Sequence, residues 1–287
     1  MALNDLPMRQ ERIFDADGVY NRVVDGNVLM HREAIATGTP ILTAWLSQQP
    51  QTRVLRVLDL ACGGKPMIIA AWMAAFPQWR FVYTGIDLNV DQLARVRTTF
   101  VFSPNVTARI VEGDAWALDT LPDDASVDLV FIGLNTHHAT PEEVAFAARH
   151  IARVLAPNGL FFNHDLFRPL RFEFFRRPTV SPTAPEKHVR LIPPEKLRGI
   201  TIPLAESTED WRTEFLQRDA DCLRSCGIAE TDVQATMEHM RERDYPISTT
   251  EMVSILTSVG LTASVHAYLN STHRLREYLA LVVANKP

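Results

Sequence analysis

The sequence predicts an α/β fold built on a seven-stranded, mostly parallel, doubly wound sheet with an antiparallel last strand. Apolar segments of strand length alternate with amphipathic helical segments through much of the chain, which is the pattern of βαβ units. Residues 127–134 are almost entirely apolar, as expected of a strand that is covered on both faces. A Gly-Gly loop directly follows the first apolar strand, as in open parallel sheets that bind ligands at the carboxyl ends of their strands.

The composition is that of an ordinary globular protein, with 287 residues, 46% hydrophobic residues and a net charge of −5. No run of Lys and Arg is present, so we expect no nucleic-acid partner. The first residues lack the charged start and apolar core of a signal peptide, and no stretch approaches the ~18 apolar residues of a membrane span, so we expect no membrane partner. Three cysteines fit a reducing compartment, which predicts a cytoplasmic protein. The sequence leaves a homodimer open.

Residues 1–50 are expected to form an N-terminal helical lid, because apolar residues recur there at helical spacing. Gly26 and the sequence Gly38-Thr39-Pro40 predict breaks between separate helices. These helices would either cover a sheet edge or close over a ligand, and in the second case Tyr20 would reach that ligand.

Residues 51–165 are expected to form the ligand-binding core. Five strands are predicted in order along this segment, at 54–60, 81–87, 108–112, 127–134 and 160–164. Pro141 and the two glutamates after it predict the start of a helix that runs to residue 155. The sequence Pro157-Asn158-Gly159 predicts the turn into the fifth strand.

The alternation stops after the fifth strand, and residues 166–246 are expected to form a helical insertion that covers the substrate. It contains a proline-rich segment and two amphipathic helical patterns, at 208–226 and from there to residue 243. Aromatic residues of the insertion would line a cavity or, as we favour for each, form the insertion's own core; they are Phe172, Phe174, Phe175, Trp211, Phe215 and Tyr245.

Residues 247–287 are expected to complete the core. A helical pattern at 249–259 precedes two strands, at 262–269 and 278–284. Because only a short segment joins these two strands, we expect them to pair as a hairpin.

Three acidic residues, Asp59, Asp87 and Asp114, stand at or just after the first three predicted strands. Each alone is most often a turn residue or a helix cap, but three at successive strand ends indicate a ligand with a positive charge and vicinal hydroxyls. A dinucleotide fits poorly, because the loop lacks the third glycine of the G-x-G-x-x-G fingerprint. A Walker loop is excluded because Lys65 is followed by Pro66.

The ordered motifs resemble those of class I S-adenosylmethionine (SAM)-dependent methyltransferases. The segment at 58–64, Leu-Asp-Leu-Ala-Cys-Gly-Gly, looks like their first motif, and Gly85-Ile86-Asp87-Leu88 resembles the second. Gly113-Asp114-Ala115 is similar to the third, and residues 153–159 resemble the R-V-L-x-P-x-G turn before their fifth strand. Together these motifs cover residues 53–165, with the closing hairpin at 262–285.

The resemblance implies SAM as the cofactor and a role for each matching residue. Backbone at Ala61 and Gly63 would hold the methionine part, and Asp59 would orient its amino group. Asp87 would accept from both ribose hydroxyls, as a carboxylate can. The remaining predicted cofactor contacts are Leu88 on the adenine, Asp114 on its amine, and Ala115, Asn135 and Tyr20. The chain departs from the family pattern at Ala61, where a glycine is usual, and at Lys65, where a small residue is common; Lys65 would point to solvent or alter the methionine end.

His138 and, with less support, His137 are the candidate catalytic residues. They follow the fourth strand, where a reacting group is expected, and histidine has the pKa range of a general base. The structural alternative is that the two histidines form hydrogen bonds with the backbone or cap the next helix. Because adjacent residues rarely point together, we expect no metal site there. His164 and Asp165 at the end of the fifth strand are weaker candidates.

The sequence therefore predicts a SAM-dependent methyltransferase that acts on an oxygen or nitrogen of a small molecule by in-line displacement. Two alternatives stay open. An enzyme of the same fold could use SAM itself as substrate, by cyclisation such as azetidine formation, by cleavage, or by modification of its methyl group. A non-catalytic SAM-binding protein is the third reading.

Overall fold

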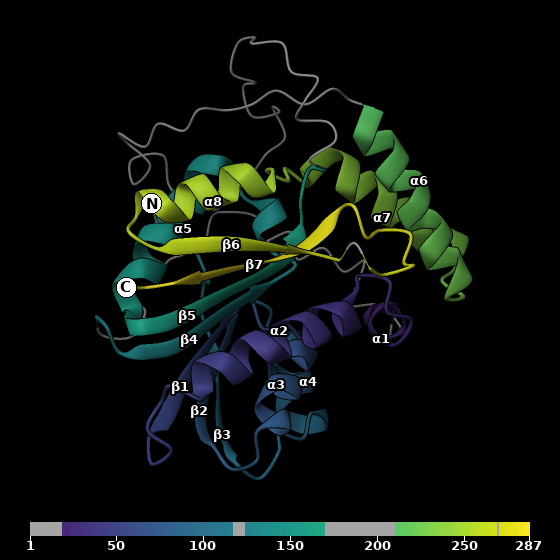
Figure 1. The fold of residues 1–287 in the computed structure, drawn as a ribbon. Helices are drawn as coiled ribbons and strands as arrows, with labels where there is room; N and C mark the ends of the chain where they lie inside the picture. The colour runs from purple at the N-terminus through teal and green to yellow at the C-terminus, as the bar shows by residue number, and fades with distance from the viewer. Residues whose placement is uncertain (1–18, 117–123, 170–209, 269) are drawn as a thin grey trace, which may run out of the picture.

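The computed structural model describes residues 19–116, 124–169, 210–268 and 270–287, and these form a seven-stranded sheet with helices on both faces (Figure 1). The strand order is β3-β2-β1-β4-β5-β7-β6. β7 pairs antiparallel with both β5 and β6, while the other pairs are parallel, so the predicted fold class is confirmed. The strands are β1 Val54–Leu60, β2 Arg80–Asp87, β3 Val106–Glu112, β4 Val127–Gly133, β5 Leu155–Leu166, β6 Thr262–Ala267 and β7 Leu279–Asn285.

The described helices also follow the predicted order. Two of them, α6 and α7, match the amphipathic patterns of the expected insertion, and the predicted C-terminal helix corresponds to α8. The helices are α1 Val19–Asp25, α2 His31–Leu46, α3 Met67–Ala75, α4 Val90–Thr99, α5 Pro141–Val154, α6 Asp210–Ser225, α7 Glu230–Arg243 and α8 Thr249–Ser258, with a 3-10 turn, η3, at Thr136–His138. None of them combines the length and apolar character that a membrane span needs. The expected helices before residue 19 and the proline-rich part of the insertion lie outside the described residues.

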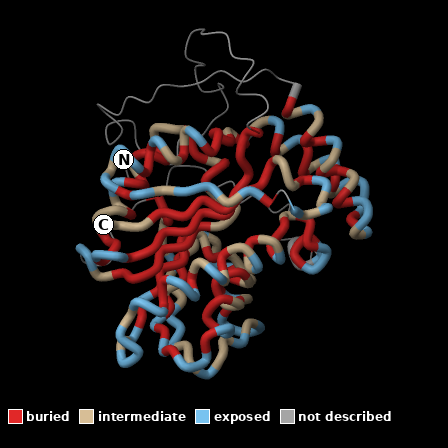
Figure 2. The backbone as a smooth tube through the Cα atoms, viewed as in Figure 1, coloured by how far each residue is buried: buried red, intermediate tan, exposed pale blue. Residues whose placement is uncertain are grey.

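Alternating residues of the central strands build two separate hydrophobic cores, one on each face of the sheet. Leu129 and Phe131 of β4 belong to the core that also contains residues of α2, α3, α6 and α7. Val130 and Ile132 point the other way and pack with α5 and α8. Because successive side chains of a strand face opposite sides, a strand buried on both faces is apolar along most of its length. Figure 2 shows these strands as the buried centre of the molecule.

The predicted break at Gly38-Thr39-Pro40 is wrong, because α2 is continuous and contains Pro40. Gly38 serves packing: a Cβ at this position would lie 2.1 Å from the Trp72 ring of α3. The Trp72 indole also donates to the carbonyl of Ile35 at 3.1 Å, which ties α3 to α2 beside this contact. Pro40 cannot donate the helical hydrogen bond to the carbonyl of Ala36, yet α2 continues through it.

The ends of α5 and α8 show why these helices begin where they do. Thr140 caps α5 through a capping box with Glu143, and Pro141 occupies the first turn as predicted. Ser248 and Glu251 form the same motif at α8. At the other end of α5 the predicted turn is part of β5, where Asn158 adopts a left-handed φ of 61°.

Candidate active site

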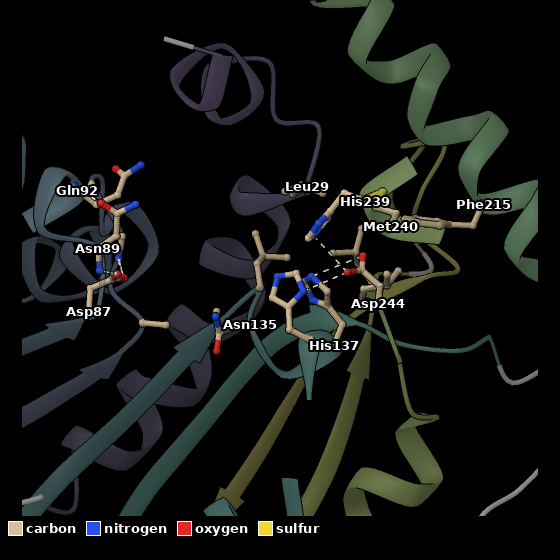
Figure 3. Close-up of a pocket in the computed structure, with 18 residues that line it drawn as sticks. Leu29, Asp87, Asn89, Gln92, Asn135, His137, Phe215, His239, Met240 and Asp244 are labelled. Carbon is tan, nitrogen blue, oxygen red and sulfur yellow. Dashed lines mark hydrogen bonds and ion pairs between the residues drawn. The ribbon is translucent and has the colours of Figure 1, made fainter. Parts of the chain in front are cut away.

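A cavity of about 260 Å³ opens at the carboxyl ends of β1, β2 and β4. Gly63 and Asp87 line one part of it, and His137, His138 and Asp244 line another. Figure 3 shows Asp87 at one end and His137 at the other, with Asn135 between them. Phe215 of α6 and Met240 of α7 complete the wall on the histidine side, so the two helices of the insertion cover this end of the cavity.

The loop after β1 is shaped by two residues in the left-handed backbone region. Ala61 has a φ of 57° and Gly63 a φ of 59°. This conformation turns the backbone of the loop so that the N–H of Gly63 donates to Oδ2 of Asp87 at 2.8 Å. Glycine adopts such a φ freely, whereas alanine is strained there. The alanine at position 61, where the family usually has a glycine, therefore carries backbone strain.

Asp87 ends β2 and joins this loop to the next helix. Its Oδ1 accepts from the backbone N–H of Asn89 at 2.8 Å, in addition to the bond from Gly63. The side chain of Asn89 in turn caps α4 by accepting from the backbone of Asp91 and Gln92. The carboxylate at the strand end is therefore fixed in position by neighbouring backbone.

His137 is oriented by a buried carboxylate. Its Nδ1 donates to Oδ1 of Asp165 at 2.5 Å, and Asp165 is fully buried. Oδ2 of Asp165 also accepts from the backbone of Asn135 at 3.0 Å and of Thr136 at 2.7 Å. Burial alone would lower the pKa of His137, but the carboxylates of Asp165 and Asp244 outweigh it and raise this pKa to about 9.

His138 and His239 face the same carboxylate as His137. Nδ1 of His138 lies 3.0 Å from Oδ1 of Asp244, and Nε2 of His239 lies 3.5 Å from the same oxygen. Nε2 of His137 is 3.9 Å from Oδ2 of Asp244. Burial of its ring and the neighbouring His137 lower the pKa of His138. Three imidazoles thus surround one carboxylate in the cavity wall.

Comparison with known families shows that residues 57–159 match the model of a methyltransferase domain. Those residues form a class I, Rossmann-like methyltransferase domain. The matched segment runs from β1 to the turn within β5 and contains the glycine loop, Asp87 and both histidines of η3. The cofactor of this family is SAM. No curated protein sequence matches the chain.

Two solved structures show the same fold as this methyltransferase domain and its covering helices. One is the plantazolicin methyltransferase BamL, solved with a substrate analogue and S-adenosylhomocysteine (SAH), at 12% identity and a TM-score of 0.55, over 96% of this chain and 93% of that one. The other is a chain from the complex between the Haloferax volcanii Trm112 methyltransferase activator and a methyltransferase, at 15% identity and a TM-score of 0.52, over 96% of both chains. At these identities the likeness concerns the fold.

Asp59 of the methyltransferase domain faces the protein interior in this structure. Its side chain is buried within β1, does not line the cavity and accepts from the Tyr83 hydroxyl at 2.7 Å. Burial raises the pKa of Asp59 to about 8, Tyr83 opposes the shift and Asp87 adds to it. The expected contact between Asp59 and the SAM amino group stays a prediction.

Of the other residues predicted to contact the cofactor, Asn135 lines the cavity in the structure and Leu88, Asp114 and Ala115 do not. Oδ1 of Asp114 accepts from the backbone of Trp116 at 2.8 Å, and the Trp116 indole donates to Oδ1 of Asn135 at 2.8 Å. Ala115 is buried, and Leu88 is 42% exposed. Tyr20 lies in α1, and its side chain is outside the described part of the structure.

Lys65 does not extend the cavity wall. Its Nζ donates to Oδ1 of Asp25 at 2.8 Å, so it connects the glycine loop to the last residue of α1. The sequence left open whether Lys65 points to solvent or alters the methionine end of the pocket. The partly exposed ion pair is closer to the first alternative.

His239, Met240 and Asp244 are site residues that the sequence reasoning missed. They lie at the end of α7, far along the chain from His137, and no motif connects the two segments. The predicted insertion helix was the available signal, since a helix that covers the sheet must present some residues to the cavity. Phe215 is both buried core and cavity wall, which unites the two alternatives left open for it.

Proposed function

We propose that this protein transfers the methyl group of SAM to an oxygen or nitrogen of a small molecule. The observation that carries the proposal is one cavity that extends from Gly63 and Asp87 to the histidines of η3. A cofactor at the loop end would direct its sulfonium toward the histidine end, where the acceptor would sit. Proximity and alignment of the two reactants supply much of the rate in such a displacement.

Asp87 is the residue on which cofactor binding depends most in this proposal. A carboxylate offers about four lone-pair positions, and the backbone of Gly63 and Asn89 uses two of them. In this proposal the carboxylate, held in place by these bonds, would accept from the two ribose hydroxyls. Gly63 lines the cavity, so its backbone would approach the methionine part, and Leu88 would cover the adenine.

The acceptor would bind between η3 and the two insertion helices. Phe215 and Met240 provide an apolar wall there, and His138 and His137 provide the polar groups. A cavity of about 260 Å³ that two helices cover fits a small molecule better than a polymer. In this proposal both histidines contact the reacting end of the acceptor, as the sequence predicts.

Calorimetric titration with SAH tests the cofactor half of the proposal. We expect Asp87→Asn to weaken binding at least tenfold, because a charge-assisted bond contributes ~1.5–3 kcal/mol and a factor of ten is ~1.4 kcal/mol. Asp91→Asn is the matched control: this exposed carboxylate lies in the first turn of α4, and its loss should leave the affinity unchanged. Equal affinities in wild type and Asp87→Asn would show that SAM does not bind here.

Incubation with SAM tests the reaction. With SAM alone we expect no turnover, and with a panel of small hydroxyl and amine compounds we expect SAH and a methylated product by mass spectrometry. Formation of methylthioadenosine from SAM alone would contradict methyl transfer and favour the reading in which SAM is the sole substrate.

A further inference from the structure

Three histidines and one aspartate converge from two distant parts of the chain at the acceptor end of the cavity. We call them the His–Asp cluster; its members are His137, His138, His239 and Asp244. The first two belong to η3, while His239 lies in α7 and Asp244 directly follows that helix. Figure 3 shows His137, His239 and Asp244 directed toward one another. The backbone N–H of Tyr245 donates to the carbonyl of His137 at 2.5 Å, so the two segments are joined beside the cluster.

Three members of the cluster lie close enough together to share a single ion. One ligand atom each from His137, His138 and Asp244 can be chosen so that all lie within 4.8 Å of one another. His239 adds a ring nitrogen 3.5 Å from the Asp244 carboxylate. In a tetrahedral zinc site, with metal–ligand distances of ~2.1 Å, the ligand atoms stand ~3.4 Å apart. His137, His138 and Asp244 form the core of such a site, and His239 stands beside Asp244 as a further donor.

The hydrogen bond between His137 and Asp165 orients the first ligand. Because Nδ1 is bonded to Asp165, Nε2, which faces Asp244, is the nitrogen that would lose its proton to bind an ion. Metal-binding histidines commonly donate their other ring N–H to a carboxylate in this way. Asp165 is itself fixed by the backbone of Asn135 and Thr136, so the ring is positioned before any ligand arrives.

Asp244 supplies the second, independent observation. Its side chain is 3% exposed, and neither carboxylate oxygen has a hydrogen bond of good geometry within the described residues. Its ion-pair partners in that part of the chain are histidine rings. A divalent ion between these rings would bind this carboxylate directly and would compensate its charge in place of a protonated imidazole.

We propose that the His–Asp cluster binds a divalent transition-metal ion. Three imidazole nitrogens and one carboxylate oxygen are the donor set that Zn²⁺ and its neighbours in the first row prefer, whereas Mg²⁺ and Ca²⁺ select oxygen ligands. The sequence-based expectation of no metal rested on two adjacent histidines alone. The structure adds His239 and Asp244 from the other side of the cavity.

The role of the ion rests on the proposed function, while its binding does not. The cluster lies at the acceptor end, so the ion would hold an oxygen or nitrogen of the acceptor and lower the pKa of a bound hydroxyl. A bound ion would use the imidazole lone pairs, and the histidines would therefore act on the acceptor through the ion.

The experiment is a metal titration of the full chain after treatment with a chelator and dialysis. We expect one equivalent of Zn²⁺ to bind by calorimetry, and Co²⁺ to give the visible absorption of a tetrahedral site. Asp244→Asn should weaken Zn²⁺ binding at least ~100-fold, and Asp165→Asn, which acts through His137, should weaken it ~10–100-fold. His138→Gln, at the most exposed ring of the cluster, serves if Asp244→Asn does not fold. His266→Gln, on β6, is the matched control and should keep the wild-type affinity.

SAH titrations of the same samples separate this proposal from the previous one. A folded protein that binds SAH but neither Zn²⁺ nor Co²⁺ would overturn the metal site and leave the cluster as a network of hydrogen-bonded histidines. Equal Zn²⁺ affinity in wild type, Asp244→Asn and His138→Gln would place the ion elsewhere and also overturn it. Zn²⁺ binding that is lost in these variants, in a protein that does not bind SAH, would support the metal site and overturn the proposed function.

Discussion

The glycine loop offers a clean measurement of backbone strain, because two of its residues share one conformation and differ by one methyl group. Gly63 has a φ of 59°, and a Cβ added there would meet no atom within 4 Å. Gly63→Ala therefore tests the backbone cost alone. A left-handed L-residue costs ~1–2 kcal/mol, and the lower entropy of the unfolded alanine chain returns ~0.4–1 kcal/mol. We expect a net loss of ~1 kcal/mol.

The reverse change at Ala61, with a φ of 57°, should not give the opposite result. Ala61→Gly relieves a similar strain, but the unfolded chain gains entropy and the methyl group loses its contact with the core that contains α5. Removing a buried methyl group costs up to ~0.8 kcal/mol. We therefore expect a change within ~0.5 kcal/mol of zero.

Thermal unfolding followed by circular dichroism measures both changes. For a chain of this size ~1 kcal/mol corresponds to ~2–4 °C in Tm, so Gly63→Ala should melt a few degrees earlier than Ala61→Gly. Gly227→Ala is the matched control, because this glycine has a φ of 72°, equally open space and a position after α6. It should lower Tm by the same amount and leave SAH affinity unchanged, whereas Gly63→Ala places a methyl group in the cofactor loop and should weaken SAH binding. A Tm unaffected by Gly63→Ala would refute a left-handed loop.

Two further predictions concern buried groups with shifted pKa values. Burial raises the pKa of Asp59 to about 8, so between pH ~4 and 8 the folded protein keeps a proton that the unfolded chain releases, and stability falls as pH rises through that range. Asp59→Asn should remove this loss in urea titrations at pH 5 and 8, and an unchanged pH slope would contradict the shift. Burial, with help from His164 and Lys65, lowers the pKa of His31 to about 3. As the pH falls, the unfolded chain therefore takes up a proton before the folded protein does, and stability falls from pH ~6.5 toward 3. His31→Phe should reduce this slope by up to ~1.4 kcal/mol per pH unit. Identical midpoints of acid unfolding in the wild type and the variant would contradict the lowered pKa of His31.

The position of Asp87 at the cavity could be predicted from the sequence because it depends on local rules. Asp87 is the last residue of β2, and a carboxylate at a strand end of a parallel sheet meets the ligand crevice. Asp59 precedes the last residue of β1, and the same rule placed it in the crevice although it remains inside the sheet beside Tyr83. In the register of the sheet Asp59 is level with Gly85, two residues before Asp87.

At the histidine end of the cavity, only some of the residues could be predicted from the sequence. His137 and His138 follow a recognisable strand, but Asp244 and His239 reach them by packing of α7 over the sheet, and side-chain spacing along the chain carries no information about such a contact. The continuous helix α2 shows the same limit, since the packing of Trp72 from another helix against Gly38 cannot be seen in the sequence around Pro40. Long-range packing decided both cases.

The position of β7 between β5 and β6 sets an order of events for folding. β5 is buried along most of its length, yet its partner on one side is β7, and α6, α7 and α8 all lie between these two strands in the chain. Until β7 docks, β5 is an apolar edge strand, and such edges readily pair with other chains. β6 reaches the sheet through β7. Synthesis of the last strand is thus the step that closes the sheet, and a chain interrupted before residue 279 would leave its most apolar edge open to aggregation.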